Sequence, residues 1–148
     1  MTKSQRLKPV REIASSKENE AARQMGEQQR FLTEQKQRLV ELNNYRTEYA
    51  NKMMSAGSTG IGAGQMQEYS RFISRLDEAM AFQRQQIAIA ERTLEVRQRE
   101  WRAMHTRSEA LNKVVNRYEK AEHHERERRE QQESDEHAQR LRRILHDL

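Results

Sequence analysis

The sequence contains no cysteine, which excludes disulfide frameworks and cysteine-ligated metals. Pro9 is its one proline, so no later residue lacks the backbone N–H that a helix needs. No stretch approaches the roughly 20 apolar residues of a membrane-spanning helix. The N-terminus also lacks the apolar segment of a secretory signal. These absences favour a soluble, intracellular protein with no transmembrane segment.

Apolar residues are scarce as well. Hydrophobic residues make up 34%, charged residues 34%, and the mean hydropathy is -1.22. A single packed core usually contains closer to roughly half apolar residues, so the composition favours either disorder or an elongated structure that buries a narrow seam. The net charge of +5 is spread over interleaved signs with no basic block, which weakens both a nucleic-acid and a membrane-surface interpretation.

Glycine is concentrated in one place, since all of the glycines except Gly26 lie within residues 57–64. This stretch is the one strong helix breaker in the chain, and the sequence on both sides is rich in Gln, Glu, Arg, Ala and Leu, which form helices readily. We therefore predict four segments: a first coiled-coil arm (1–54), a glycine-rich turn (55–65), a second coiled-coil arm (66–118) and a charged extension, helical or disordered (119–148).

Both arms carry a seven-residue apolar repeat with two seam positions in each repeat. In the first arm the two series start at Leu7 and Arg11; in the second they start at Tyr69 and Ile73, and most of their members are apolar or aromatic. A sustained repeat of this period predicts a supercoiled seam. The fold class is therefore all-α: a long antiparallel two-stranded coiled-coil hairpin with a polar C-terminal extension. The coil would be on the order of 70 Å long, with the first arm covering the second as far as about residue 112.

The extension changes character along its length. Between Glu119 and His137, Ala121 is the one apolar residue, so no seam is available there. A short amphipathic patch returns at the end of the sequence: Ala138, Leu141, Ile144, Leu145 and Leu148. Its small size is typical of a docking element that becomes ordered on a partner.

No pattern predicts catalysis, a cofactor or a metal site. Adjacent histidines such as His123 and His124 point in different directions on a helix and do not form a metal pair. The glycine-rich stretch lacks the Lys-Ser/Thr of a phosphate-binding loop. Arginines around Trp101 could serve a nucleic-acid-associated coiled coil, but Trp101 occupies a seam position, where burial explains it. A generic structural coiled coil that self-assembles is a further alternative.

Aromatic residues gather on both sides of the predicted turn. The antiparallel pairing brings six residues within a few helical turns of it: Leu42, Tyr45, Tyr49, Phe72, Leu76 and Ala79. Of the aromatic residues among these, Tyr45 and Phe72 fall outside the seam positions. Either they form an exposed protein contact site, or the seam is broader near the turn and buries them.

These residues carry a resemblance to a known family. The segment Glu20–Glu27, the Leu42-x-x-Tyr45-x-x-Glu48-Tyr49 run, the run from Tyr69 through Phe72 to Ala79, and Arg99–Arg102 around Trp101 all resemble FliJ, a flagellar type III export protein. The resemblance runs from near the start of the chain to about residue 121.

The resemblance implies an antiparallel coiled coil that is not an enzyme and works in flagellar protein export. It implies contacts with the export ATPase hexamer (FliI) and its regulator (FliH), with the export gate FlhA and with export chaperones. The implied location is cytoplasmic, peripherally associated with the inner membrane at the flagellar base. The gate-binding residues would be Leu42, Tyr45, Tyr49, Phe72, Leu76 and Ala79, with Arg38 and Gln83 as two further positions. The end remote from the turn would enter the ATPase ring.

Overall fold

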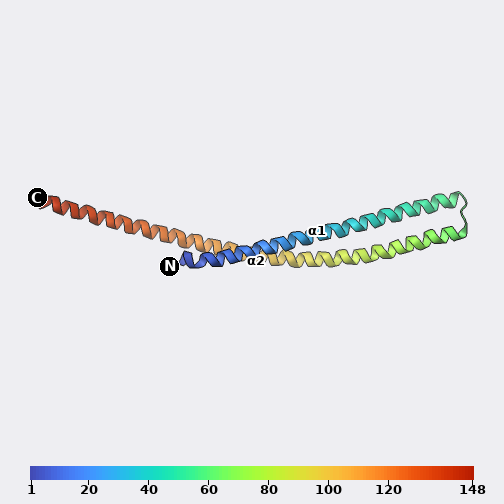
Figure 1. Cartoon of the computed structure of the whole chain (residues 1–148), viewed down its shortest axis with the longest axis horizontal. Coiled ribbons are helices and arrows are strands. Elements are labelled where there is room, and N and C mark those ends of the chain that lie inside the picture. Colours follow the sequence, from blue (N-terminus) through green and yellow to red (C-terminus); the bar gives the residue numbers. More distant parts are fainter. The chain divides into compact units, whose positions relative to one another are not determined.

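The computed structural model describes the whole chain, residues 1–148, as two α-helices joined by a short turn (Figure 1). Helix α1 spans Lys3–Ser58 and helix α2 spans Ala63–His146, and there are no strands. The helices pack against each other in opposite directions, which confirms the predicted all-α antiparallel hairpin. Neither helix contains a stretch apolar enough to cross a lipid bilayer.

The chain divides into two compact units, each of which pairs a segment of α1 with a segment of α2. The turn unit comprises Glu20–Trp101 and contains the turn. The terminal unit comprises Met1–Asn19 and Arg102–Leu148 and contains both chain ends. Each unit has its own seam, and we describe them separately.

The turn is shorter than the glycine-rich stretch that predicts it. Helix α1 continues to Ser58 and α2 begins at Ala63, so the turn between them consists of residues 59–62. Gly60 has a φ of 83°, and the N–H groups of Gly60 and Ile61 donate to the carbonyls of Gly57 and Ala56 at 3.4 and 3.3 Å. This is the Schellman arrangement, which ends a helix at a left-handed residue. The hydrogen bonds explain why α1 ends at this point.

The seam of the turn unit combines apolar and polar layers. Leu32, Leu76, Met80 and Ala90 are buried, as the repeat predicts. Polar seam positions are satisfied across the two helices: the Gln83 side-chain amide donates to the Gln35 side chain and backbone carbonyls at 2.7 and 2.9 Å. Gln28 similarly donates to the carbonyl of Ala90 at 3.2 Å. Because a buried polar pair needs its partner, these glutamines favour one register of the coil.

The terminal unit has a smaller and more polar seam. Ala14 and Val115 are buried, and Val115 is fully enclosed at 0% exposure. The backbone N–H and the hydroxyl of Ser4 donate to the Glu122 carboxylate at 3.1 and 2.5 Å. Pairing therefore reaches Glu122 and extends beyond the predicted limit near residue 112. A capping box between Thr2 and Gln5, with bonds of 3.1 and 3.3 Å, explains the early start of α1.

Helix α2 continues past its contacts with α1 as far as His146, in the terminal unit (Figure 1). Every residue from Arg126 onward is exposed. Ion pairs within the helix support the start of this segment, since Arg128 and Arg129 lie 3.0 and 3.5 Å from Glu125. The apolar residues near the C-terminus stay exposed, with Leu145 at 69%.

Candidate partner-binding site

The predicted contact residues lie in the turn unit and differ in exposure. Tyr45 is 55% exposed, as a contact site requires. Tyr49 and Phe72 are half-buried and pack against each other across the two helices, with ring centroids 4.4 Å apart. The Tyr69 ring lies 6.5 Å from the Tyr49 ring. Tyr45 therefore fits the first alternative, an exposed contact site. Phe72 fits the second, a seam that is broader near the turn and partly buries it.

The remaining predicted residues range from exposed to buried. Leu42 and Ala79 are half-buried and Arg38 is exposed. Leu76 and Gln83 are buried at 8% and 7% exposure, so a partner cannot reach their side chains without separating the helices. Both contribute to the seam that positions the exposed residues around them.

Charged groups border the aromatic residues of the turn unit. Arg46 donates to Asp77 across the two helices at 2.5 Å, which raises the pKa of Arg46. The Lys52 ammonium lies 5.0 Å from the Tyr49 ring centroid, within range of a cation–π interaction. It also lies 3.3 Å from Glu48. These contacts place charged side chains along the border of the aromatic surface.

A shallow hollow beside these rings was not predicted from the sequence. It is lined by Tyr49, Gln65, Glu68, Tyr69 and Phe72. Two of its aromatic residues, Tyr49 and Tyr69, carry a sequence signal because they occupy seam positions. Gln65 and Glu68 carry none, since polar residues on the first turns of a helix are common wherever the surface is solvated.

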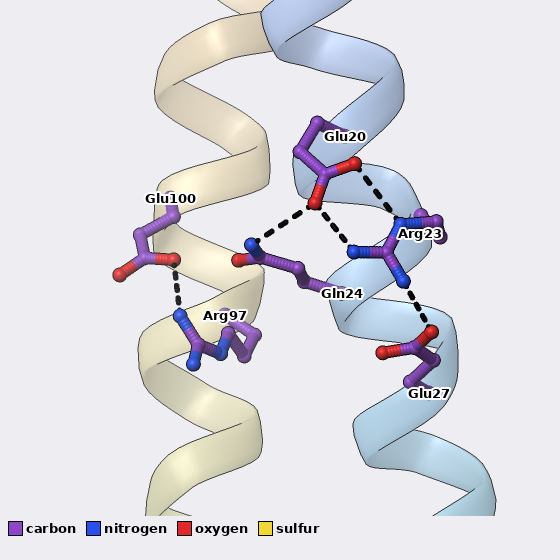
Figure 2. Close-up of polar contacts among 6 residues, drawn as sticks. All are labelled: Glu20, Arg23, Gln24, Glu27, Arg97 and Glu100. Carbon is purple, nitrogen blue, oxygen red and sulfur yellow. Dashed lines mark hydrogen bonds and ion pairs between the residues drawn. The ribbon is translucent and has the colours of Figure 1, made fainter.

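The Glu20–Glu27 segment forms a polar network on the surface of α1 (Figure 2). Arg23 lies between Glu20 and Glu27 and bonds to both, while Gln24 donates to Glu20 at 3.3 Å. The hydrogen bond from Arg23 lowers the pKa of Glu20. On α2, Arg97 donates to Glu100 at 3.1 Å (Figure 2). These are bonds between helical neighbours, which stabilise the helix surface.

The fold and the aromatic surface define the class: an all-α, two-stranded antiparallel coiled coil with an aromatic cluster beside its turn. The profile of the family described as "Flagellar FliJ protein" matches residues 2–143. The chain therefore belongs to the FliJ family.

Two curated relatives cover nearly the whole chain. The Flagellar FliJ protein of Escherichia coli (strain K12) is 29% identical over 134 residues, covering 90% of this chain and 91% of the relative. The Flagellar FliJ protein of Salmonella typhi is 26% identical over 134 residues, with the same coverage. No solved structure matches the chain with comparable significance.

Proposed function

We propose that this protein is a non-catalytic component of the flagellar type III export apparatus that couples the export ATPase to the export gate. Membership of the FliJ family supports a role in the flagellum. In this proposal the turn unit contacts the gate FlhA. The terminal unit, with the exposed C-terminal part of α2, contacts the ATPase FliI and its regulator FliH. The protein also acts as a general export chaperone and chaperone escort, at the cytoplasmic face of the inner membrane.

The exposed ring of Tyr45 is the observation that most supports gate binding. It lies in the turn unit, on the helix that also presents Tyr49 to Phe72. Tyrosine is one of the residue types that most often dominate the binding energy of protein interfaces. The packed pair Tyr49–Phe72 fixes the local backbone, so Tyr45 is presented on a rigid surface.

The experiment compares Tyr45→Ala with Val40→Ala in binding to the cytoplasmic domain of the gate. Val40 is a matched control because it is 50% exposed and lies on the same helix, five residues away. We expect Tyr45→Ala to weaken binding by roughly 30-fold, the loss associated with an interface hot spot of about 2 kcal/mol. Val40→Ala should leave the affinity unchanged. Equal gate affinity for the two variants would remove the basis of the proposed contact.

The ATPase contact needs a separate test. Replacing Leu141, Ile144 and Leu145 together by serine removes apolar surface from the exposed end of α2 without touching the turn unit. We expect capture by the ATPase hexamer to fall while gate binding is retained. If the triple variant keeps both ATPase capture and gate binding, these residues have no role in coupling.

A further inference from the structure

The seam divides each helix of the turn unit into two sides. Residues that directly follow a seam position lie on one side, and residues that directly precede one lie on the other, because successive helical residues are about 100° apart. Lys36 and Glu91 each follow a seam residue, and they meet across the helices at 3.9 Å. They define an ion-pair face on one side of the helix pair. The residues that precede seam positions form the opposite face.

That opposite face carries an unusual number of apolar residues. On α1 it includes Phe31 and Tyr45, which are 46% and 55% exposed. On α2 it includes five residues at seven-residue spacings in two rows: Phe72 and Ala79, and Phe82, Ile89 and Val96. The last three are 61%, 50% and 42% exposed. We call these seven residues the apolar stripe.

The face that carries the apolar stripe is as large as one side of a protein interface. Its α2 part runs from Phe72 to Val96, about 36 Å of helix. Two helices side by side are about 20 Å wide, so the face covers about 700 Å² per copy, close to the roughly 800 Å² per partner of a stable complex.

Charge is distributed unequally at the two borders of the apolar stripe. The α1 border is a ridge of exposed glutamates at seven-residue spacing: Glu20, Glu27, Glu34, Glu41 and Glu48. Two of them, Glu20 and Glu27, are seen in Figure 2 with Arg23, whereas Glu34 and Glu41 form no ion pair within the chain. On the α2 side the exposed basic residues are Arg71, Arg75, Arg92 and Arg99, and the exposed acidic residues are Glu68, Glu78 and Glu100.

We propose that this face is a self-association surface, on which a second copy of the chain packs with its turn at the same end. A two-fold axis parallel to the helices places α1 of one copy over α2 of the other. The glutamate ridge of each copy then faces the arginine side of its partner, and the apolar stripes cover each other. The opposite orientation would place glutamate ridge on glutamate ridge, and like charges in an interface are strongly unfavourable. The resulting four-helix arrangement has antiparallel neighbours throughout.

Self-association does not depend on the proposed function. It has a consequence for that function, because the dimer would cover Tyr45 and the exposed part of Phe72. Gate binding and self-association would then compete, and the two are measured separately.

The first test is sedimentation equilibrium of the full chain from micromolar to near-millimolar concentration. We expect a concentration-dependent monomer–dimer equilibrium. Ile89→Glu should weaken it by about 100-fold or more, since each dimer buries the new charge twice. Val40→Glu is the matched control: Val40 is also 50% exposed but follows seam residue Leu39, on the ion-pair face. Far-UV circular dichroism checks that both variants stay helical.

A chain that stays monomeric at every concentration overturns the proposal, as does an equal effect of the two substitutions. A monomeric chain in which Ile89→Glu abolishes gate binding would assign the face to the gate.

The second test determines the orientation. Because the chain has no cysteine, Thr59→Cys provides one spin-label site in the turn of each copy. Parallel packing places the two labels within about 30 Å of each other. The opposite packing separates them by about 66 Å, since the middle of the apolar stripe lies about 22 residues from the turn. The longer distance would overturn the proposed arrangement.

Discussion

The two units of the molecule hold α1 and α2 together by different means. In the turn unit the contacts are leucine, methionine and aromatic packing around a buried glutamine pair. In the terminal unit small residues such as Ala14 and Ser108 line the seam. Bonds to carboxylates tie its helices together: Ser4 to Glu122, Lys8 to Glu119 and His105 to Glu18.

This difference has energetic consequences. Burial of large apolar side chains is insensitive to pH and salt and contributes most to stability. Ion pairs between half-exposed groups contribute little and respond to both conditions. We therefore expect the turn unit to be the stable part of the coil and the terminal unit to be the adjustable part, where pairing can open without disturbing the aromatic surface.

The largest expected effect comes from Leu76→Ala, which leaves a cavity in the turn unit. Such substitutions cost about 2–5 kcal/mol. Native-state hydrogen exchange, read by peptide, should show the loss of protection within Glu20–Trp101 and much less within the terminal unit. Val40→Ala, on the exposed surface of α1, is the control. An equal loss of protection in both units would show that they unfold together, which contradicts the proposed difference in stability between them.

Gln83→Ala tests the polar layer of the turn unit. It leaves the buried Gln35 amide without its partner, which costs about 1–3 kcal/mol. Replacing both Gln35 and Gln83 by leucine should recover the thermal stability, because no polar group is then left unpaired. If the double variant is as unstable as Gln83→Ala, the pair contributes through packing shape and not through hydrogen bonding.

The sequence predicts the seam well and its polar details poorly. Leu76 and Val115 follow directly from the seven-residue repeat. Gln35 and Gln83 interrupt the repeat when each helix is considered alone, and their pairing becomes visible only once the register of the two helices is known. The glycine-rich stretch predicts a turn, but which glycine adopts a positive φ depends on hydrogen bonds from Gly60 and Ile61 back into α1.

The candidate site shows the same limit of local information. Tyr45 and Phe72 hold equivalent positions in the repeat, since each directly precedes a seam residue. Phe72, on α2, is less exposed than Tyr45 because Tyr49 of α1 packs on the Phe72 ring. The apolar periodicity of one arm does not predict which residue of the other arm packs against a given side chain.

A smaller effect is expected from Ser4→Ala in the terminal unit. The change removes the hydroxyl that donates to Glu122, a loss of about 1 kcal/mol. Hydrogen exchange should accelerate in the first turns of α1 and leave the turn unit unchanged. Ser16→Ala, at an exposed position of the same helix, should have no such effect. A similar acceleration in both variants would assign the change to helix propensity.

The smallest effect, and the most specific to the terminal unit, is a pH dependence that centres on His105. Its ring nitrogens lie 2.6 Å from Glu18 on α1 and 3.2 Å from Glu109 on its own helix. The hydrogen bond with Glu18 raises the pKa of His105 above its ordinary value of 6.5. Hydrogen bonds from His105 and then Ser108 lower the pKa of Glu18 below 4.5.

The sign of each contribution follows from these directions. The His105 contribution is fully present below pH 6.5 and is lost as the pH rises through the raised pKa. The Glu18 contribution is present above pH 4.5 and is lost as the pH falls through the lowered pKa. Both contributions are fully present between pH 4.5 and pH 6.5, so pairing in the terminal unit is strongest in that range.

Comparison of the natural chain with His105→Gln from about pH 5 to about pH 8 measures this dependence across the titration range of histidine. The difference in hydrogen-exchange protection of the terminal unit should shrink as the pH rises, because only the protonated ring can donate to both carboxylates, whereas the neutral ring has one N–H to donate. The turn unit contains no histidine, so its protection should not differ between the two proteins at any pH. A constant difference in the terminal unit would mean that His105 acts there through packing alone.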